Sequence, residues 1–379
     1  MRTSAEIPPA EKVGMSAPIT SVRAEAFRIP TDLPEADGTF EWNATTLVLV
    51  EIQADGVSGL GYTYSDACVA PLINKTLSTV LLGEDATQIA RLWKRVLRHV
   101  RNLGREGIAA TALSAIDCAL WDLHAKRVGV SLVALLSAER EAVPVYGSGG
   151  FTTYSDTQMR DQLAGWVDND GCRWVKIKIG SDPARDPSRV RAAREAIGID
   201  RGLFVDANGA FSAKTALHFA EAFSAEGVEW FEEPVSSDDL HGLRAVREHT
   251  PAGMDIAAGE YGYTADYFRT MLEAGAVDVL QADASRCGGV TGFLQAAQVA
   301  DAFHVPLSAH CAPALHLHVA AAARGLRHQE WFHDHVRIES MLFEGAPRVV
   351  DGCIAPDLSR PGCGLEFKRA DAKRFAVDA

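Results

Sequence analysis

Three carboxylates are placed where they could hold a metal ion. Asp206, Glu232 and Glu260 each follow a short apolar run, at the point where a predicted β-strand ends. Neighbouring strands lie about 4.8 Å apart, so the three side chains can converge. Three anions at that spacing repel one another, and a hard divalent cation such as Mg²⁺ suits their oxygens. One such residue alone is explained more simply as a helix cap or a surface ion pair, but three in equivalent positions predict a magnesium site.

Basic groups in the same set of segments predict proton transfer. Lys176 and Lys178 fall on one face of a strand, because strand side chains repeat with a period of two. The charge on Lys176 is expected to favour a neutral amine on Lys178, a candidate general base. Asp283 and His310 end neighbouring strands, where the carboxylate would fix the imidazole tautomer and support its cation. Solvated lysines and a structural histidine are the simpler interpretations, but the apolar flanks of Lys178 and the strand-end position of His310 disfavour them.

A barrel would bring these residues together. From about residue 143 the sequence alternates short apolar strands with amphipathic helices, which is typical of a barrel with catalytic residues at the C-terminal strand ends. The eight predicted strands are Val143–Gly147, Trp174–Ile179, Leu203–Asp206, Trp230–Phe231, Asp255–Ala258, Val277–Ala282, Val305–Ser308 and about Val336–Glu339. A ring of charge at those ends would be costly without a function.

Four segments are expected along the chain. Residues 1–19 predict a disordered lead, and residues 20–142 predict an α+β domain in which a strand meander precedes helices. Residues 143–344 form the α/β barrel. The Pro/Gly-rich segment 345–379 is expected to pack back on the first domain.

The composition restricts the partners. The chain has 379 residues, 47% of them hydrophobic and 23% charged, which is enough for a full core. A net charge of −13 argues against nucleic acid or an anionic membrane as a general partner. The sequence contains no run of about 18 apolar residues, so no transmembrane helix is predicted. It also shows no recognisable secretory signal. The seven cysteines are scattered and lack CxxC spacing, which favours reduced thiols in a cytoplasmic protein.

Taken together, the motifs resemble the mandelate racemase group of the enolase superfamily. They are KIK at 176–178, VDANGAF at 205–211, FEEP at 231–234, GE at 259–260, ADASRCGGVT at 282–291 and SAH at 308–310. The resemblance covers about residues 20 to 368. It implies a modified (β/α)7β TIM barrel behind an N-terminal α+β capping domain, one Mg²⁺ per subunit, and a homo-oligomer between dimer and octamer. The metal ligands would be Asp206, Glu232 and Glu260.

The resemblance also implies the chemistry. Lys178 would be one acid/base, the His310–Asp283 dyad the other, and Glu339 an electrophile that hydrogen-bonds the carboxylate of a small-molecule substrate. Removal of the proton α to that carboxylate would be the shared step. We expect dehydration of a polyhydroxylated sugar acid to a 2-keto-3-deoxy acid, with a racemase, an epimerase or a lactone cycloisomerase as the alternative.

Specificity is expected to come from two capping loops, residues 31–42 and 62–65, whose hydroxyls and carboxylates favour a polyhydroxylated acid over an aromatic one. The predicted substrate-binding residues are Lys176, Asn208, Tyr62 and Trp42. Two competing hypotheses are a Schiff-base enzyme that uses Lys178 and a non-catalytic binding protein. The three carboxylates argue against the first, and the complete set of acid/base residues argues against the second.

Overall fold

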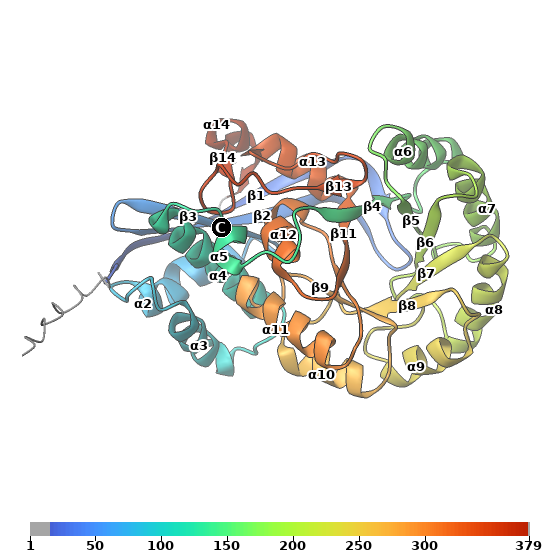
Figure 1. The fold of residues 1–379 in the computed structure, drawn as a ribbon, viewed down its shortest axis with the longest axis horizontal. Coiled ribbons are helices and arrows are strands. Elements are labelled where there is room, and N and C mark those ends of the chain that lie inside the picture. The colour runs from blue at the N-terminus through green and yellow to red at the C-terminus, as the bar shows by residue number, and fades with distance from the viewer. Residues whose placement is uncertain (1–15, 378–379) are drawn as a thin grey trace, which may run out of the picture.

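The larger part of the chain is a closed barrel of parallel strands. The computed structural model describes residues 16–377 (Figure 1). The barrel strands are β4 (Val143–Gly149), β5 (Trp174–Lys178), β6 (Gly202–Asp206), β7 (Val228–Glu232), β8 (Asp255–Ala258), β9 (Val279–Ala282), β10 (Leu307–Ala309) and β11 (Leu326–Phe332). They are hydrogen-bonded in this order, and β11 pairs with β4 to close the barrel. The predicted fold class is therefore confirmed.

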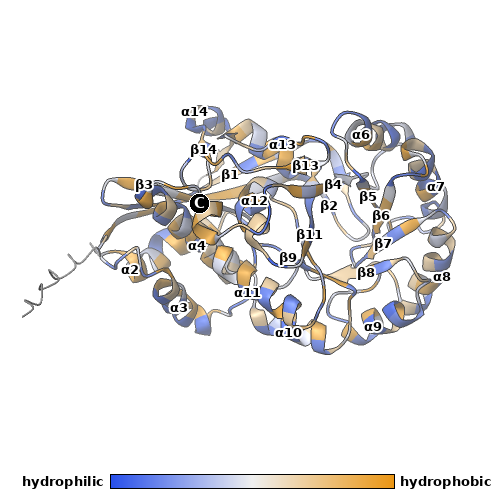
Figure 2. Ribbon diagram, in the orientation of Figure 1, coloured by the Kyte–Doolittle hydropathy of each residue, from blue (hydrophilic) through white to orange (hydrophobic). Residues whose placement is uncertain are grey.

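Helices surround the barrel. They are α6 (Asp156–Asp168), α7 (Asp186–Ile197), α8 (Ala213–Ser224), α9 (Leu240–His249), α10 (Ala265–Glu273), α11 (Gly289–Ala302), α12 (Pro313–Ala322) and α13 (His333–Leu342). Seven of them connect successive strands, and α13 follows the last strand. Figure 2 shows both hydrophilic and hydrophobic residues on outer helices such as α8, as expected for helices with one face on the barrel and one in water.

The predicted eighth strand is wrong in position. Residues 336–339 belong to α13, and the strand is β11, ten residues earlier at Leu326. In β11 the polar side chains of His328, Gln329 and Glu330 are fully buried. The segment therefore lacks the apolar run by which a buried strand is usually predicted. Its buried polar residues are stabilised by hydrogen bonds and ion pairs instead of apolar contacts.

An antiparallel sheet and a set of helices form the cap beside the barrel (Figure 1). Its strands are β1 (Ile19–Ala36), β2 (Glu41–Ala54) and β3 (Val57–Tyr64). The helical elements are α1 (Val69–Leu72), η1 (Ile73–Leu77), α2 (Ser78–Leu81), α3 (Ile89–His99), η2 (Val100–Asn102), α4 (Ile108–Val128) and α5 (Leu132–Leu136). The helix α4 is buried over most of its length and contacts both β3 and the barrel helix α11. It therefore joins the two parts, and Figure 2 shows its hydrophobic character.

Both expected capping loops are mostly strand. β1 continues to Ala36 and β2 begins at Glu41, so that only a short turn remains between them. Residues 62–64 end β3. The first segment is predicted as a loop because it contains charged residues and prolines. The sheet accommodates them through a register shift between Pro30 and Glu35.

The two ends of the described chain both reach the capping sheet. Residues 1–15 of the expected disordered lead lie outside the described residues, whereas Ala17 is buried and Ile19 begins β1. The C-terminal elements are β12 (Phe343–Glu344), β13 (Cys353–Ile354), β14 (Glu366–Phe367), α14 (Arg369–Ala372), η3 (Lys373–Phe375) and β15 (Ala376–Val377). β13 pairs with the barrel strand β4, and β15 pairs with β1 of the cap. Within residues 16–377, no helix is both long and apolar enough for a membrane span.

The contact between α4 and β3 generates a stability prediction. A Cβ at Gly61 would lie 2.2 Å from the carbonyl oxygen of Ala115 in α4, so Gly61→Ala must push the helix and the strand apart. We expect the free energy of unfolding to fall by about 3 kcal/mol, measured by urea denaturation. Gly165→Ala in α6 is the control, because its nearest neighbour would be 3.8 Å away; it should stabilise the protein by about 1 kcal/mol. Equal stability of Gly61→Ala and the wild type would contradict this packing argument.

Candidate active site

Three carboxylates converge at the C-terminal ends of β6, β7 and β8. Asp206 pairs in register with Glu232, and Glu260 stands two residues beyond the end of β8. One ligand oxygen from each lies within 4.8 Å of the others, and all three side chains are buried. The barrel thus brings together the three residues that the sequence analysis singled out.

Two buried oxygens around this cluster have no hydrogen-bond partner. They are Glu233 Oε1 and Asn208 Oδ1. Asn208 and Glu233 also have left-handed backbones, with φ of 48° and 38°, which non-glycine residues adopt at a cost that is common at functional sites. Buried oxygens without donors are expensive. Carboxylate and amide oxygens in this number fit a hard divalent cation such as Mg²⁺.

The carboxylates also shift one another's pKa. Burial, followed by the charge of Asp206, raises the pKa of Glu232 to about 8. Burial alone would raise the pKa of Glu260 as well, but His310 and then Arg286 hold it well below its usual value. Positive charge close to the cluster therefore stabilises its ionised carboxylates.

Lys178 and Lys176 supply part of that charge. Lys178 Nζ lies 2.5 Å from Asp206 Oδ2. Burial and Lys176 would lower the pKa of Lys178, yet Asp206, Glu232 and Glu260 together outweigh them and raise it. Lys176 acts in the expected direction, toward a neutral amine, but the nearby carboxylates have the larger effect on Lys178. Lys176 Nζ is 2.5 Å from Glu232 Oε1 and 2.8 Å from Glu330 Oε1.

His310 is held by Asp283 at the opposite side of the carboxylate cluster. His310 Nδ1 lies 2.8 Å from Asp283 Oδ2, and Asp283 Oδ1 accepts a hydrogen bond from the Ser285 amide. This leaves His310 Nε2 toward Glu260 Oε2 at 3.0 Å and Cys311 Sγ at 3.2 Å. Burial would lower the pKa of His310, but Cys311, Glu260 and Glu330 raise it well above its usual value. An imidazolium held in this way can donate a proton from Nε2.

Glu330 is a site residue that the sequence pattern does not reveal, and Glu339 lies in a helix instead of the predicted strand. Glu330 lies in β11, where it accepts hydrogen bonds from Ser148 and from the Cys311 amide and sits 3.7 Å from His310 Nε2. Glu339 lies in α13, where its two oxygens bind the Tyr62 hydroxyl at 2.6 Å and the Ala314 amide at 3.0 Å. A carboxylate between the polar and aromatic residues of HQEWF was the signal that could have identified Glu330.

A cavity of about 280 Å³ lies over the cluster, close to the roughly 300 Å³ at which small-molecule sites begin. Its lining residues are Asp37, Phe40, Trp42, Ala44, Thr45, Lys178, Asn208, Glu260, Tyr261, Arg286, His310, Cys311, Phe332 and His335. The cap reaches the barrel directly, since a Cβ at Gly38 would lie within 2.6 Å of backbone oxygens just after β5 and β6. Phe40 and Trp42 stack at 6.3 Å between ring centroids.

Two of the four predicted substrate-binding residues, Asn208 and Trp42, line this cavity. The other two do not: Lys176 is fully buried below the cavity, and Tyr62 is fully buried against Glu339. The Tyr62 and Thr63 hydroxyls, which were expected to face a substrate, instead bond Glu339 and the Ser285 carbonyl of the barrel. The stacked aromatic pair lines the cavity.

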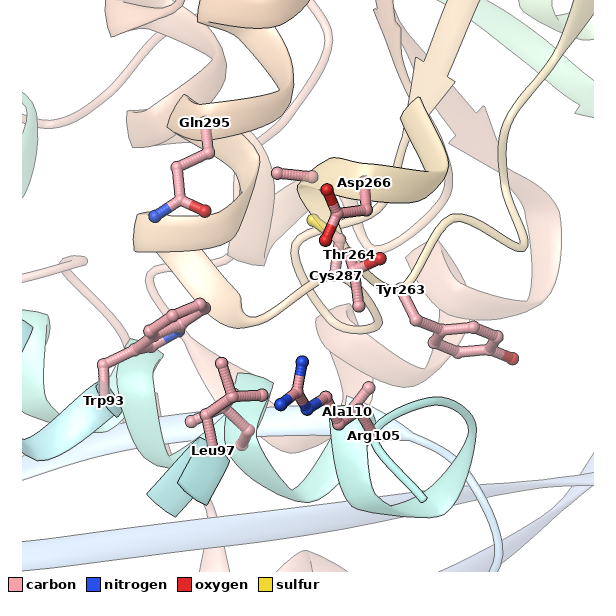
Figure 3. Close-up of a pocket in the computed structure, with 11 residues that line it drawn as sticks. Trp93, Leu97, Arg105, Ala110, Tyr263, Thr264, Asp266, Cys287 and Gln295 are labelled. Carbon is pink, nitrogen blue, oxygen red and sulfur yellow. The ribbon is translucent and has the colours of Figure 1, made fainter. Parts of the chain in front are cut away.

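A second hollow, of about 200 Å³, separates the capping helices from the barrel (Figure 3). Trp93 and Leu97 of α3 face Thr264 and Asp266 at the start of α10 across it. It contains none of the converging carboxylates and neither proton-transfer candidate, so the barrel mouth is the candidate active site.

Comparison with known proteins identifies the family of the chain. Residues 23–137 match the mandelate racemase / muconate lactonizing enzyme N-terminal domain, and residues 158–372 match the enolase C-terminal domain-like family. A 3,6-anhydro-alpha-L-galactonate cycloisomerase from Streptomyces coelicolor is 35% identical over 367 residues, which covers 93% of this chain and 98% of that protein.

Two solved structures are similar over nearly the whole chain. A mandelate racemase/muconate lactonizing enzyme-like protein from Rubrobacter xylanophilus has a TM-score of 0.93 and 46% identity, covering 95% of this chain and 100% of that one. An L-talarate dehydratase from Polaromonas sp. JS666, complexed with Mg and L-glucarate, has a TM-score of 0.86 and 31% identity, covering 96% and 98%.

The buried ion pairs of Lys176 generate a second stability prediction. Lys176→Met would leave Glu232 and Glu330 without their shared cation, and loss of one partner of a buried pair costs about 3–5 kcal/mol. We expect that loss in urea denaturation of the chelator-treated protein. Lys214→Met, which removes an exposed amine of α8, should change stability by less than about 0.5 kcal/mol. A similarly small effect at Lys176 would mean that its carboxylate partners do not need it.

Proposed function

Because the chain belongs to the mandelate racemase / muconate lactonizing enzyme family of the enolase superfamily, we propose that it catalyses the Mg²⁺-dependent dehydration of a polyhydroxylated sugar acid to a 2-keto-3-deoxy acid. One observation carries the proposal. Lys178 and the Asp283-held His310 enter the same cavity from β5 and from the end of β10, with the converging carboxylates between them. Two proton-transfer groups around one cation site suit removal of a proton and departure of a hydroxyl.

Asp206, Glu232 and Glu260 would hold the Mg²⁺. Their converging oxygen atoms and the unpartnered oxygens of neighbouring Glu233 and Asn208 support this assignment. The chemistry that a bound Mg²⁺ supplies is a fixed positive charge beside the substrate carboxylate, which makes the neighbouring proton easier to remove.

Lys178 and His310 would divide the proton transfers. One of them, in its neutral form, takes the α-proton, and the configuration of the substrate decides which one. A cation held by Asp206 and Glu260 would offset the carboxylate charges that raise the pKa of both groups, and so make a neutral base available. His310, as an imidazolium, gives a proton to the β-hydroxyl, so that the carbon–oxygen bond breaks and water leaves. The resulting enol then becomes the keto acid. Asp283 would act through His310, by keeping Nδ1 occupied and Nε2 toward the cavity.

Glu330 would be a positioning residue. It is the carboxylate of the last barrel strand, the place where the family resemblance implied Glu339. Its bonds to the Cys311 amide and to Lys176 fix the segment that carries His310. Lys176 and His310 hold the pKa of Glu330 below its usual value against the effect of burial, so its carboxylate is ionised and accepts hydrogen bonds.

A second candidate function is cycloisomerisation of a sugar-acid lactone. The stacked Phe40 and Trp42 at the cavity would suit the face of a ring. The Streptomyces coelicolor relative, a cycloisomerase, favours the same candidate. The initial proton removal would be shared with dehydration, and the leaving oxygen would be that of the ring.

Product mass separates these functions. We expect that a panel of aldonic and aldaric acids, incubated with the Mg²⁺-loaded protein, yields a product about 18 Da lighter than its substrate, because water is lost. Mass spectrometry measures this, and a keto-acid assay identifies the carbonyl. A lactone substrate that turns over without a change in mass would establish the second candidate instead.

The proton-transfer residues predict distinct variant behaviour. We expect Lys178→Ala and His310→Asn each to lower kcat at least about a hundredfold, since a positioned acid or base contributes about 10² to 10⁴. Asp283→Asn combined with His310→Asn should cost little more than His310→Asn alone, because Asp283 acts through the imidazole. Glu339→Gln is the control, because Glu339 contacts Tyr62 and Ala314 outside the cavity, and it should remain within a few-fold of wild type. Full activity of both Lys178→Ala and His310→Asn on the same substrate would refute the assignment.

A further inference from the structure

A second group of metal-ligating side chains lies between the cap and the barrel. Asp32 and Glu35 come from β1, and His333 is the first residue of α13. One ligand atom from each lies within 4.8 Å of the others. His333 Nε2 is 3.0 Å and 3.2 Å from the two Asp32 oxygens. The group therefore connects segments that are 301 residues apart in the sequence, and it shares no residue with the candidate active site.

Glu35 has an unusual environment for a carboxylate. It is fully buried, and its Oε2 accepts a hydrogen bond from Trp42 Nε1 at 2.8 Å. Its Oε1 is buried without a hydrogen-bond partner. Leaving a buried carboxylate oxygen unpartnered is costly unless a cation or a proton compensates it. The Tyr154 hydroxyl is also buried without a partner, and burial and then Glu35 raise the pKa of this hydroxyl.

The surroundings of Glu35 are acidic. Two further carboxylates, those of Asp32 and Asp334, act on the buried Glu35. Asp334 is itself paired with Arg337 at 2.5 Å. Arg337 also donates to the Pro30 carbonyl, and its charge only partly offsets the effect of the carboxylates on Glu35. The group thus combines converging donors, an unpartnered buried oxygen and a local excess of negative charge.

We propose that Asp32, Glu35 and His333 form a second divalent-cation site, for a first-row transition ion of the Zn²⁺ type. An imidazole nitrogen beside two carboxylates suits such an ion, whereas Mg²⁺ prefers oxygen ligands alone. The side chains of Asp32 and His333 are 41% and 25% exposed, which gives the ion an entry path and leaves room for water ligands. The proposal does not depend on the function of the barrel mouth.

Such an ion would fasten the capping hairpin to the barrel. Asp32 and Glu35 precede the turn that carries Phe40, and Glu35 binds the Trp42 side chain, so the ion would hold both aromatic residues over the cavity. Its occupancy is therefore expected to change KM more than kcat.

Zinc retention tests the site. The full-length protein is stripped with a chelator, equilibrated with millimolar Mg²⁺, exposed to micromolar Zn²⁺ and desalted, and bound Zn²⁺ is counted by plasma mass spectrometry. Asp32→Asn and His333→Gln should each retain about one Zn²⁺ fewer per chain than wild type. Glu41→Gln, which removes an exposed carboxylate from the same hairpin, should match wild type. Binding at the Asp206 cluster is common to all four proteins and cancels in the comparison.

Anomalous diffraction at the zinc edge locates the ion without relying on variants. Crystals of the wild-type protein in the same Mg²⁺ and Zn²⁺ mixture should show a peak between Asp32, Glu35 and His333. Equal zinc retention in wild type and both variants, or a peak confined to the Asp206 cluster, would overturn the proposal. Glu35 would then be compensated by a proton. If a variant does not fold, the wild-type peak alone decides.

Discussion

The mouth of the barrel buries several like charges, and the rest of the site depends on how they are held. Asp206, Glu232 and Glu330 share one fully buried cation, the ammonium of Lys176. Buried ions cost several kcal/mol each unless close partners compensate them. Lys176 therefore fixes carboxylates from three strands, while the buried Glu233 Oε1 remains without a hydrogen bond. An excess of carboxylates over buried cations suits a barrel mouth that takes a second positive charge from outside the chain.

The same constraint explains the role of the cap. Electrostatic interactions strengthen when water is excluded. The capping hairpin contacts the barrel and so reduces the access of water to the cavity. Gly38 approaches the backbone after β5 and β6 so closely that no side chain fits, and Phe40 and Trp42 then lie at the cavity. The packing of α4 against β3 and α11 holds that sheet to the barrel. The close approach at Gly38 therefore places the hairpin over the cavity in which the proposed chemistry would occur.

The sequence predicts the carboxylate cluster well because Asp206, Glu232 and Glu260 end strands whose apolar character is plain. Glu330 is hidden, since β11 carries polar residues that are satisfied only by partners from other strands. The sequence also does not predict that Lys176 is fully buried. The period of two places Lys176 and Lys178 on the same face of the strand, but it does not say how far each lies from the mouth of the barrel. The prediction of a loop at the capping hairpin is wrong for a different reason. Its prolines and charges are typical of a loop, and a bulge and contacts with the barrel keep it extended.

The central claim is that a cation at Asp206, Glu232 and Glu260 makes the α-proton removable. The most direct measurement follows loss of deuterium to water from a sugar acid labelled at its α-carbon, in chelator-stripped protein, as Mg²⁺ is added back. We predict no loss of the label without a cation, recovery with Mg²⁺, and none at any Mg²⁺ concentration for a folded Glu232→Gln variant. Full loss of the label with the stripped protein, or with Glu232→Gln, would contradict this claim.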